Sequence, residues 1–294
     1  MPIPKLLHHL HLYKNLSCEG SSHTFIYGGN VNFSNSGINA EISGEKTEKT
    51  NIDIYADNLM FKNSSFIDAA SAISAGIGGD ININVAGNFI MSGLHPRSKP
   101  FVKETKKLNN NWIFASAFDE GKGGNINIEA NEMTLLDGSQ IDISVLGNGD
   151  ASDSVLTIKV KDVLTVAGQH PTNIVVVSLI GSFSENLKPG ASGNSGFIDV
   201  EARKVVLLDG GGILAITTGF GNAGNVRIKV YEDLIIAGNM QVIDDPFKDS
   251  EVELLPWSTG IQAGSTPLYV RGQGQGQPGN VEVEAENIIL KDGG

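Results

Sequence analysis

The residue types that most often perform catalysis or bind metals occur in this sequence, but not in the patterns that such chemistry requires. The six histidines include no His-Glu-x-x-His pair or other metal-ligand spacing. His8, His9 and His11 are close enough to bind a metal adventitiously, but a disordered or misannotated start is the simpler interpretation. No serine lies in a Gly-x-Ser-x-Gly elbow, and the single cysteine, Cys18, can form neither an intrachain disulfide nor a cysteine zinc site. The sequence therefore predicts no catalytic residue, no bound metal and no cofactor.

Carboxylates recur at one kind of position, where they could serve either an enzyme or a turn. Asp137, Asp209 and Asp292 each precede a glycine at the end of a predicted strand. Asp-Gly at such a place favours a tight turn. Polysaccharide-active enzymes of the pectate-lyase type instead place carboxylates and basic residues together on one face. We interpret these acids as turn residues and predict that the chain is not an enzyme, with a polysaccharide-active enzyme as the alternative.

Two segments concentrate charge of opposite sign. Residues 94–111 hold five basic side chains against one acid, Glu104, which gives a local net charge of +4 (5 − 1). Residues 239–256 hold five acids against Lys248, a local net charge of −4 (1 − 5). The basic side chains belong to Arg97, Lys99, Lys103, Lys106 and Lys107. Because loops on a rigid scaffold often carry binding residues, we predict that this basic loop contacts anionic surface glycans; a merely solvated loop is the alternative.

The overall composition is that of an acidic, glycine-rich, β-forming chain. Glycine contributes 36 of 294 residues without a collagen period, and the net charge of −12 argues against generic binding to nucleic acid. No apolar run is long enough for a transmembrane helix, and His8, His9, His11 and Lys14 interrupt what a signal peptide would need. We interpret residues 1–24 as a non-conforming segment, either disordered or a mis-called start.

An internal repeat determines the predicted fold. A thirteen-residue block recurs seven times without gaps, with apolar residues at its first, third and fifth positions in every copy. The fifth is always Ala or Val, the second is always polar, and six copies end in glycine. Such alternation is typical of a half-buried strand. The blocks begin at Ile52, Ile81, Ile126, Leu156, Ile198, Val226 and Val281.

Each repeat supplies about three strands and no helix. A second apolar stretch follows within the block, and a third short strand follows some blocks at once, as at Ile67-Asp-Ala69. Successive blocks start 29, 45, 30, 42, 28 and 55 residues apart, which indicates a unit of 28–30 residues with insertions in the longer intervals. Both charged segments follow the terminal glycine of a block, so we expect them to leave the scaffold at the same corner. Three short strands per unit favour a β-solenoid over a leucine-rich repeat, an ankyrin array or a propeller.

Stacking of the repeats accounts for the residue pattern. Equivalent positions would lie one above another at about 4.8 Å, so that like residues form ladders. The first and third positions would fill the interior, and Ala or Val would fit where the coil narrows at a corner. The residue before the block predicts an asparagine-rich ladder, formed by Asn51, Asp80, Asn125, Asn225 and Asn280.

The repeats resemble those of filamentous haemagglutinin-type large exoproteins, the secreted partners of two-partner secretion systems. The match is clearest in Gly123-Gly-Asn-Ile-Asn-Ile-Glu-Ala, followed by Leu-Leu-Asp-Gly-Ser-Gln-Ile-Asp-Ile-Ser144, and in Gly224-Asn-Val-x-Ile-x-Val, followed by Leu-Ile-Ile-Ala-Gly238. The resemblance covers residues 25–294 and implies a right-handed parallel β-helix of about seven or more coils with loop insertions, truncated at its C-terminus. Asn35-Ser-Gly-Ile38 lacks the proline of the family's Asn-Pro-Asn-Gly secretion motif.

The resemblance also implies a function. The parent protein would be secreted or held at the cell surface through an outer-membrane transporter, and would act in adhesion or aggregation by contacting surface glycans or other cells. Two further hypotheses stay open, a polysaccharide-active β-helix enzyme and a non-functional remnant of a broken exoprotein gene. Three or more acids and bases clustered on one face would favour the enzyme, whereas plain ladders would favour the adhesin.

Overall fold

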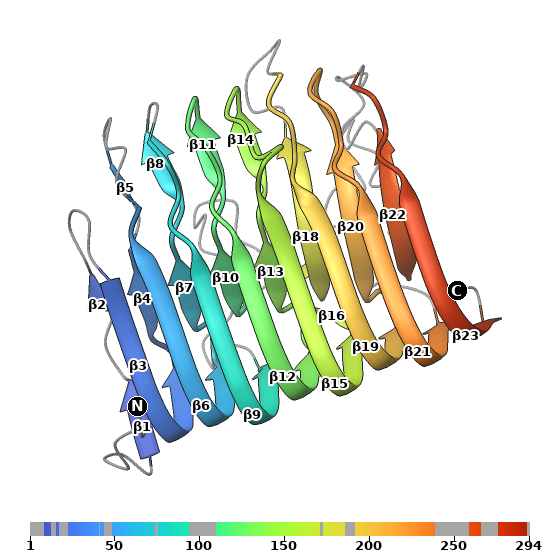
Figure 1. Cartoon of the computed structure of the whole chain (residues 1–294), viewed down its shortest axis with the longest axis horizontal. Helices are drawn as coiled ribbons and strands as arrows, with labels where there is room; N and C mark the ends of the chain where they lie inside the picture. Colours follow the sequence, from blue (N-terminus) through green and yellow to red (C-terminus); the bar gives the residue numbers. More distant parts are fainter. Residues whose placement is uncertain are drawn as a thin grey trace.

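The computed structural model describes residues 9–12, 16–17, 23–40, 42–43, 49–73, 76–93, 110–170, 173–185, 192–238, 259–265 and 276–292. Within these residues every regular element is a β-strand, and almost all strand pairs are parallel. The chain alternates between two sheets, so that equivalent strands of successive repeats lie side by side across the molecule (Figure 1). The prediction of an all-β, parallel, solenoid-like fold is confirmed.

The long strands form the first sheet, which has nine strands among the described residues. All its members except the first are ten to thirteen residues long, and from β6 onward each carries the alternating pattern of the block. In spatial order they are β1 (His9–Leu12), β3 (His23–Ser34), β6 (Asn51–Lys62), β9 (Ile81–Ser92), β12 (Ile126–Leu135), β15 (Val155–Ala167), β19 (Phe197–Leu208), β21 (Val226–Ala237) and β23 (Val281–Lys291).

The short strands form a second sheet made of two ladders that meet at one strand. The first ladder contains β2 (Leu16–Ser17), β4 (Gly37–Asn39), β7 (Phe66–Asp68), β10 (Trp112–Phe114), β13 (Gln140–Asp142), β18 (Leu179–Glu185), β20 (Gly212–Thr217) and β22 (Gly260–Ser265). The second contains β5 (Ile42–Ser43), β8 (Ser71–Ile73), β11 (Ala117–Asp119) and β14 (Val145–Gly147). Strand β18 joins them, because it pairs with β13 at its start and with β14 at its end.

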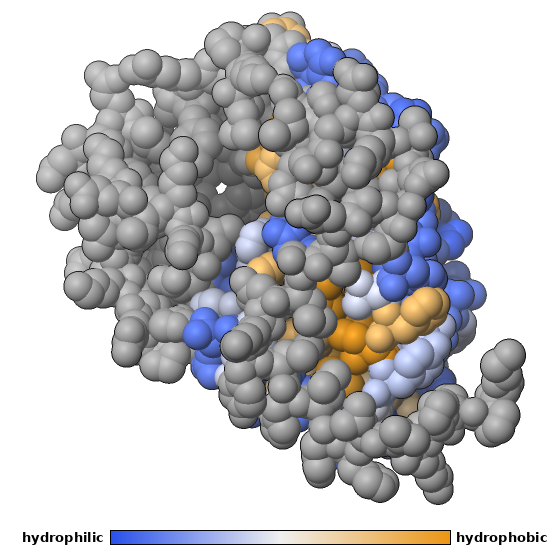
Figure 2. Space-filling view, turned by 90° about the vertical axis from the view of Figure 1, so that its left-hand side faces the viewer, coloured by the Kyte–Doolittle hydropathy of each residue, from blue (hydrophilic) through white to orange (hydrophobic). Residues whose placement is uncertain are grey.

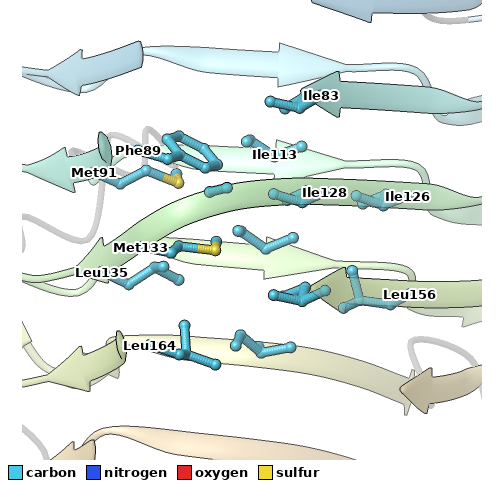
Figure 3. Close-up of a cluster of buried hydrophobic side chains, with 14 of the residues drawn as sticks. Ile83, Phe89, Met91, Ile113, Ile126, Ile128, Met133, Leu135, Leu156 and Leu164 are labelled. Carbon is cyan, nitrogen blue, oxygen red and sulfur yellow. The ribbon is translucent and has the colours of Figure 1, made fainter. Parts of the chain in front are cut away.

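One continuous interior column runs through the first sheet, as the repeat predicted. The first residues of the seven blocks are consecutive Cα partners: Ile52, Ile81, Ile126, Leu156, Ile198, Val226 and Val281. The first six are at most 1% exposed, whereas Val281, on the last strand, is 43% exposed. Figure 3 shows side chains from neighbouring strands, including Ile83, Ile126, Ile128 and Leu156, turned into the same interior.

The pairing extends toward the N-terminus beyond the seven blocks. Strand β3 continues the long sheet with Thr24 opposite Ile52, and β1 pairs with residues 30–33. Strand β2 likewise pairs with β4. Parts of residues 1–24 therefore lie in the same ladders as the repeats, and the domain boundary after residue 24 stays a prediction.

The corner within each long strand alternates between two forms. Two residues separate the inward fifth position from the next inward residue when the fifth position is Ala, and three when it is Val: Ala130 pairs with Val160, but Met133 pairs with Leu164. The fifth positions alternate strictly in the order Ala56, Val85, Ala130, Val160, Ala202, Val230 and Ala285. The sequence predicted a corner with Ala or Val, but not this two-repeat period.

Candidate binding surfaces

A long insertion follows the block-ending glycine of every second repeat, and shorter ones follow β18 and β22. We call the repeats with Ala or Val at the fifth position Ala repeats and Val repeats. The three Val repeats each end in a single glycine in the left-handed region, and a longer segment follows each one: Gly93 (φ 82°), Gly168 (φ 77°) and Gly238 (φ 76°). The Ala repeats instead close with left-handed pairs such as Asp137-Gly138 and continue directly into the short strand. The expectation that both charged segments start at the same corner is confirmed by the equivalent positions of Gly93 and Gly238. After Gly168 the insertion includes an antiparallel hairpin, β16 (Gln169–His170) and β17 (Asn173–Val177).

A common hydrogen bond fastens the base of each insertion. The carbonyl of Gly93 accepts from Asn111 Nδ2 at 3.1 Å, that of Gly168 from the Ser178 amide at 2.9 Å, and that of Gly238 from Thr259 Oγ1 at 2.6 Å. The returning residues belong to a buried column that precedes the short strands: Ser36, Ser65, Asn111, Ser139, Ser178 and Thr259. Sequence reasoning missed this column, although its signal was a recurring polar residue just before the short strands of the first ladder, with Gly211 before β20 as the exception.

The predicted glycan-contacting residues cannot be placed. Arg97, Lys99, Lys103, Lys106 and Lys107 lie outside the described residues, as do all five acids of the second charged segment. The structure does place the return of the basic segment: Asn110 and Asn111 are buried, and Ile113 joins the core with no exposed surface. Trp112 and Phe114 remain half-buried, and Trp112 lies 5.5 Å from Phe66 between ring centroids. Of the three residues of β10, only Ile113 is therefore fully buried in the core.

The asparagine-rich ladder forms as predicted, with a break in the middle. Asn51 Oδ1 accepts from the Asp80 amide at 3.2 Å, and Asp80 Oδ1 accepts from the Asn125 amide at 2.9 Å. Asn225 Oδ1 accepts from the Asn280 amide at 2.8 Å. The ladder is interrupted where Val155 and Phe197 occupy the position. These side chains satisfy backbone groups between repeats, which is a structural role.

Charged side chains line a trough on the outer surface of the long sheet. This charged trough, about 360 Å³, is lined by Glu129, Ala130, Lys159, Val160, Lys161, Glu201, Arg203 and Tyr231. The fourth block position alternates in charge from β12 to β23, in the order Glu129, Lys159, Glu201, Lys229 and Glu284. The alternation has the same two-repeat period as the corner, and it places opposite charges on adjacent strands.

Ion pairs and one tyrosine hydrogen bond engage several charged side chains in and beside this trough. Arg203 donates to both Asp162 and Glu232, one on each side, and Arg227 holds Asp199 with contacts of 2.9 and 2.6 Å. The pKa of Arg203 is raised above its usual value, mainly because its side chain donates a hydrogen bond to Asp162. The pKa of Tyr231 is raised above its usual value, mainly because its hydroxyl donates a hydrogen bond to Glu201. The cluster combines acids and bases on one face, which was the stated sign of an enzyme, but the arginine ion pairs engage several of its carboxylates.

A second trough carries no formal charge. This asparagine trough, about 490 Å³, is lined by Asn30, Asn32, Asn58, Leu59, Met60, Asn88 and Ile90. It lies across β3, β6 and β9, at the other end of the same sheet. Asn58 Nδ2 donates to Asn30 Oδ1 at 2.8 Å, and Asn58 Oδ1 accepts from the Asn88 amide at 3.0 Å.

The chain matches no protein-family model, no curated protein and no solved structure in the comparisons made.

The Asp-Gly acids adopt the turn conformation that was predicted for them. Asp137, Asp209 and Asp292 all have positive φ, of 57°, 49° and 52°. Asp137 also caps the neighbouring repeat, because its Oδ2 accepts from the Gly93 amide at 2.8 Å. Within the described ranges, no three His, Cys, Asp or Glu side chains gather as metal ligands. In the same part of the chain, no helix is long and apolar enough to cross a membrane.

Proposed function

We propose that this chain is a stretch of a cell-surface or secreted adhesin-type exoprotein, in which a rigid β-solenoid presents binding loops along one corner. The observation that carries the proposal is the repeated departure of insertions after Gly93, Gly168 and Gly238. Each insertion is fastened at its base by a hydrogen bond to the glycine carbonyl, so long loops are added without breaking the ladders. A scaffold of this kind suits binding, because loops can vary while the core stays constant.

The finer fold belongs to the same proposal. We propose a right-handed parallel β-helix of seven or more coils, since crossovers between parallel strands of one sheet are right-handed in about 98% of cases. Export of the parent protein would use an outer-membrane transporter, as in the exoproteins that the repeats resemble. The partners would be surface glycans or other cells.

Charge reversal of the basic loop tests the proposal directly. Replacing Arg97, Lys99, Lys103, Lys106 and Lys107 with glutamate should weaken adhesion of the purified chain to cells that display anionic glycans, because attraction becomes repulsion. Reversing the five acids of residues 239–256 to lysine is the matched control, since it changes as many charges at the same corner. Unchanged adhesion in the first variant, or equal loss in both, would remove the basic loop from the function.

The charged trough keeps an enzymatic alternative open. Glu201, Arg203 and Tyr231 lie together on one face, as they would in a polysaccharide-active enzyme. We propose that they act as a structural ionic ladder instead, because each is held by a partner on the neighbouring strand. Incubation with polyuronate and with neutral polysaccharides, followed by assay of reducing ends, separates the two: release of ends that Glu201→Gln abolishes would establish the enzyme.

A further inference from the structure

Three aromatic side chains stand exposed on the outer face of β3 and β6. Phe25 is 53% exposed, Tyr27 41% and Tyr55 38%. Tyr27 and Tyr55 stack with ring centroids 5.1 Å apart and planes within 6°, and Phe25 lies 6.2 Å from Tyr27 with planes within 12°. Exposed apolar groups that gather rather than scatter mark interaction sites. The mutual stacking holds the rings in place, so little side-chain freedom remains to be lost on binding.

The asparagine trough lies on the same strands, a few residues further on. Tyr27 precedes Asn30 and Tyr55 precedes Asn58 by three residues, and the corner of the long strand lies between them. Seen from the β1–β3 end of the stack, hydrophobic surface lies next to hydrophilic surface (Figure 2). The aromatic rings and the trough therefore lie on the same neighbouring strands, on either side of the corner.

The chemistry of this surface specifies its ligand. The asparagine amides supply donors and acceptors of equal number, while Met60 and Ile90 supply apolar contact. No lining residue is charged, in a chain whose net charge is −12 and whose other trough is lined by five charged residues. An anion would also meet Asp57, which is exposed between Tyr55 and Asn58. A matching ligand would offer hydroxyl groups to the amides and apolar ring faces to the aromatic side chains, and it would carry no charge. A neutral sugar has these properties.

We propose that the aromatic rings Phe25, Tyr27 and Tyr55, together with the asparagine trough, bind a neutral oligosaccharide. The inference deepens the proposed function and rests on it, because it adds a second, uncharged glycan surface on the outer face of the long sheet. The rings would stack against sugar faces, and the asparagine amides would hydrogen-bond to hydroxyl groups.

The rings offer a cleaner test than the asparagines. Asn58 bonds both to Asn30 and to the Asn88 backbone, so its replacement would disturb the stack as well as the ligand. Tyr27 and Tyr55 project from the surface and can be removed without opening the core. Tyr231, 52% exposed on β21 of the same sheet, is the matched control.

The experiment measures binding of the full chain to immobilised neutral hexasaccharides of glucose, mannose and N-acetylglucosamine, with a heparin hexasaccharide as the anionic comparison. We expect at least one neutral sugar to bind, and the Tyr27→Ala/Tyr55→Ala double variant to bind it about tenfold more weakly or worse. Tyr231→Ala should bind as the unaltered chain does, and circular dichroism checks that each variant is folded.

Two results would overturn the inference: no neutral sugar binds, or the double variant binds as well as the Tyr231→Ala control. Reversal of the five basic residues of the 94–111 loop should leave neutral-sugar binding unchanged and should reduce only heparin binding. Failure of the loop hypothesis therefore shows in the heparin arm alone, and failure of this inference shows in the neutral arm alone.

Discussion

Exchanging the alternating corner residues tests whether the two-repeat period is a packing requirement. Ala202 is 1% exposed and lies between Val160 and Val230 in the ladder. Ala202→Val adds two methyl groups to a filled corner, which costs about 1–3 kcal/mol. Val160→Ala removes two, at about 0.8 kcal/mol each for lost burial plus the cost of the cavity, or about 2–3 kcal/mol in total.

The double variant Val160→Ala/Ala202→Val decides between two explanations. It conserves the volume of the column, so if only total volume mattered the double variant would recover to within about 1 kcal/mol of the unaltered chain. If each side chain instead fits its own corner length, two residues for Ala and three for Val, the penalties add to about 3–6 kcal/mol. We expect the penalties to add.

The measurement is urea unfolding followed by far-ultraviolet circular dichroism, with hydrogen exchange of the β15 and β19 amides to locate the loss. Ile158→Val/Val200→Ile is the matched control, because these residues are fully buried Cα partners at the third position, where no alternation occurs. It should cost less than about 1 kcal/mol. Recovery of the corner double variant to the level of this control would refute the reasoning.

Three more predictions follow from single positions. Phe61→Ala should destabilise the chain by about 3–5 kcal/mol, because Phe61 is fully buried between Phe33 and Phe89; hydrogen exchange should rise in β3, β6 and β9 but not in β21. Gly224→Ala should prevent stable folding, since a Cβ there would lie 1.8 Å from the Gly196 carbonyl oxygen, while Gly264→Ala, with nothing within 4 Å, should melt as the unaltered chain does. Glu201→Ala should lower the pKa of Tyr231, because it removes the acceptor of the phenol; an unchanged alkaline absorbance titration would contradict this.

The sequence was sufficient to predict what depends on alternation within one strand. The interior column, the asparagine-rich ladder and the turn role of Asp137 all follow from which residue types recur at one position. The shared corner of the two charged segments followed in the same way, because both come after a block-ending glycine. These features are determined within a single repeat, and stacking places the same feature in each successive repeat.

What escaped prediction depends on comparison between neighbouring repeats. An ungapped thirteen-residue alignment treats the Ala and Val repeats as equivalent, although the residues at positions 130 and 160 differ (Ala130 and Val160). The one-residue shift in strand register after the fifth position is visible only when the strands are paired. The aromatic surface escaped for a related reason. Tyr27 lies in β3, which has Thr24 at the first block position and Gly28 at the fifth, so this strand did not match the block and the stacking of Tyr27 on Tyr55 could not be inferred.

The alternation also explains where insertions are tolerated. An Ala repeat closes with a left-handed pair such as Asp209-Gly210 and enters the short strand at once, so a long segment there would have to replace the turn itself. A Val repeat ends in one left-handed glycine, and a segment of variable length can follow it. The chain then rejoins the scaffold at a serine, asparagine or threonine of the buried polar column. Equivalent insertions thus recur every second ladder step, about 9–10 Å apart along the stack. A linear ligand lying along that corner would meet one loop at each such interval, whereas the sheet face offers a different surface with its own chemistry. Loops can therefore change without altering the sheet face, and this separation is why the two binding proposals can be tested independently.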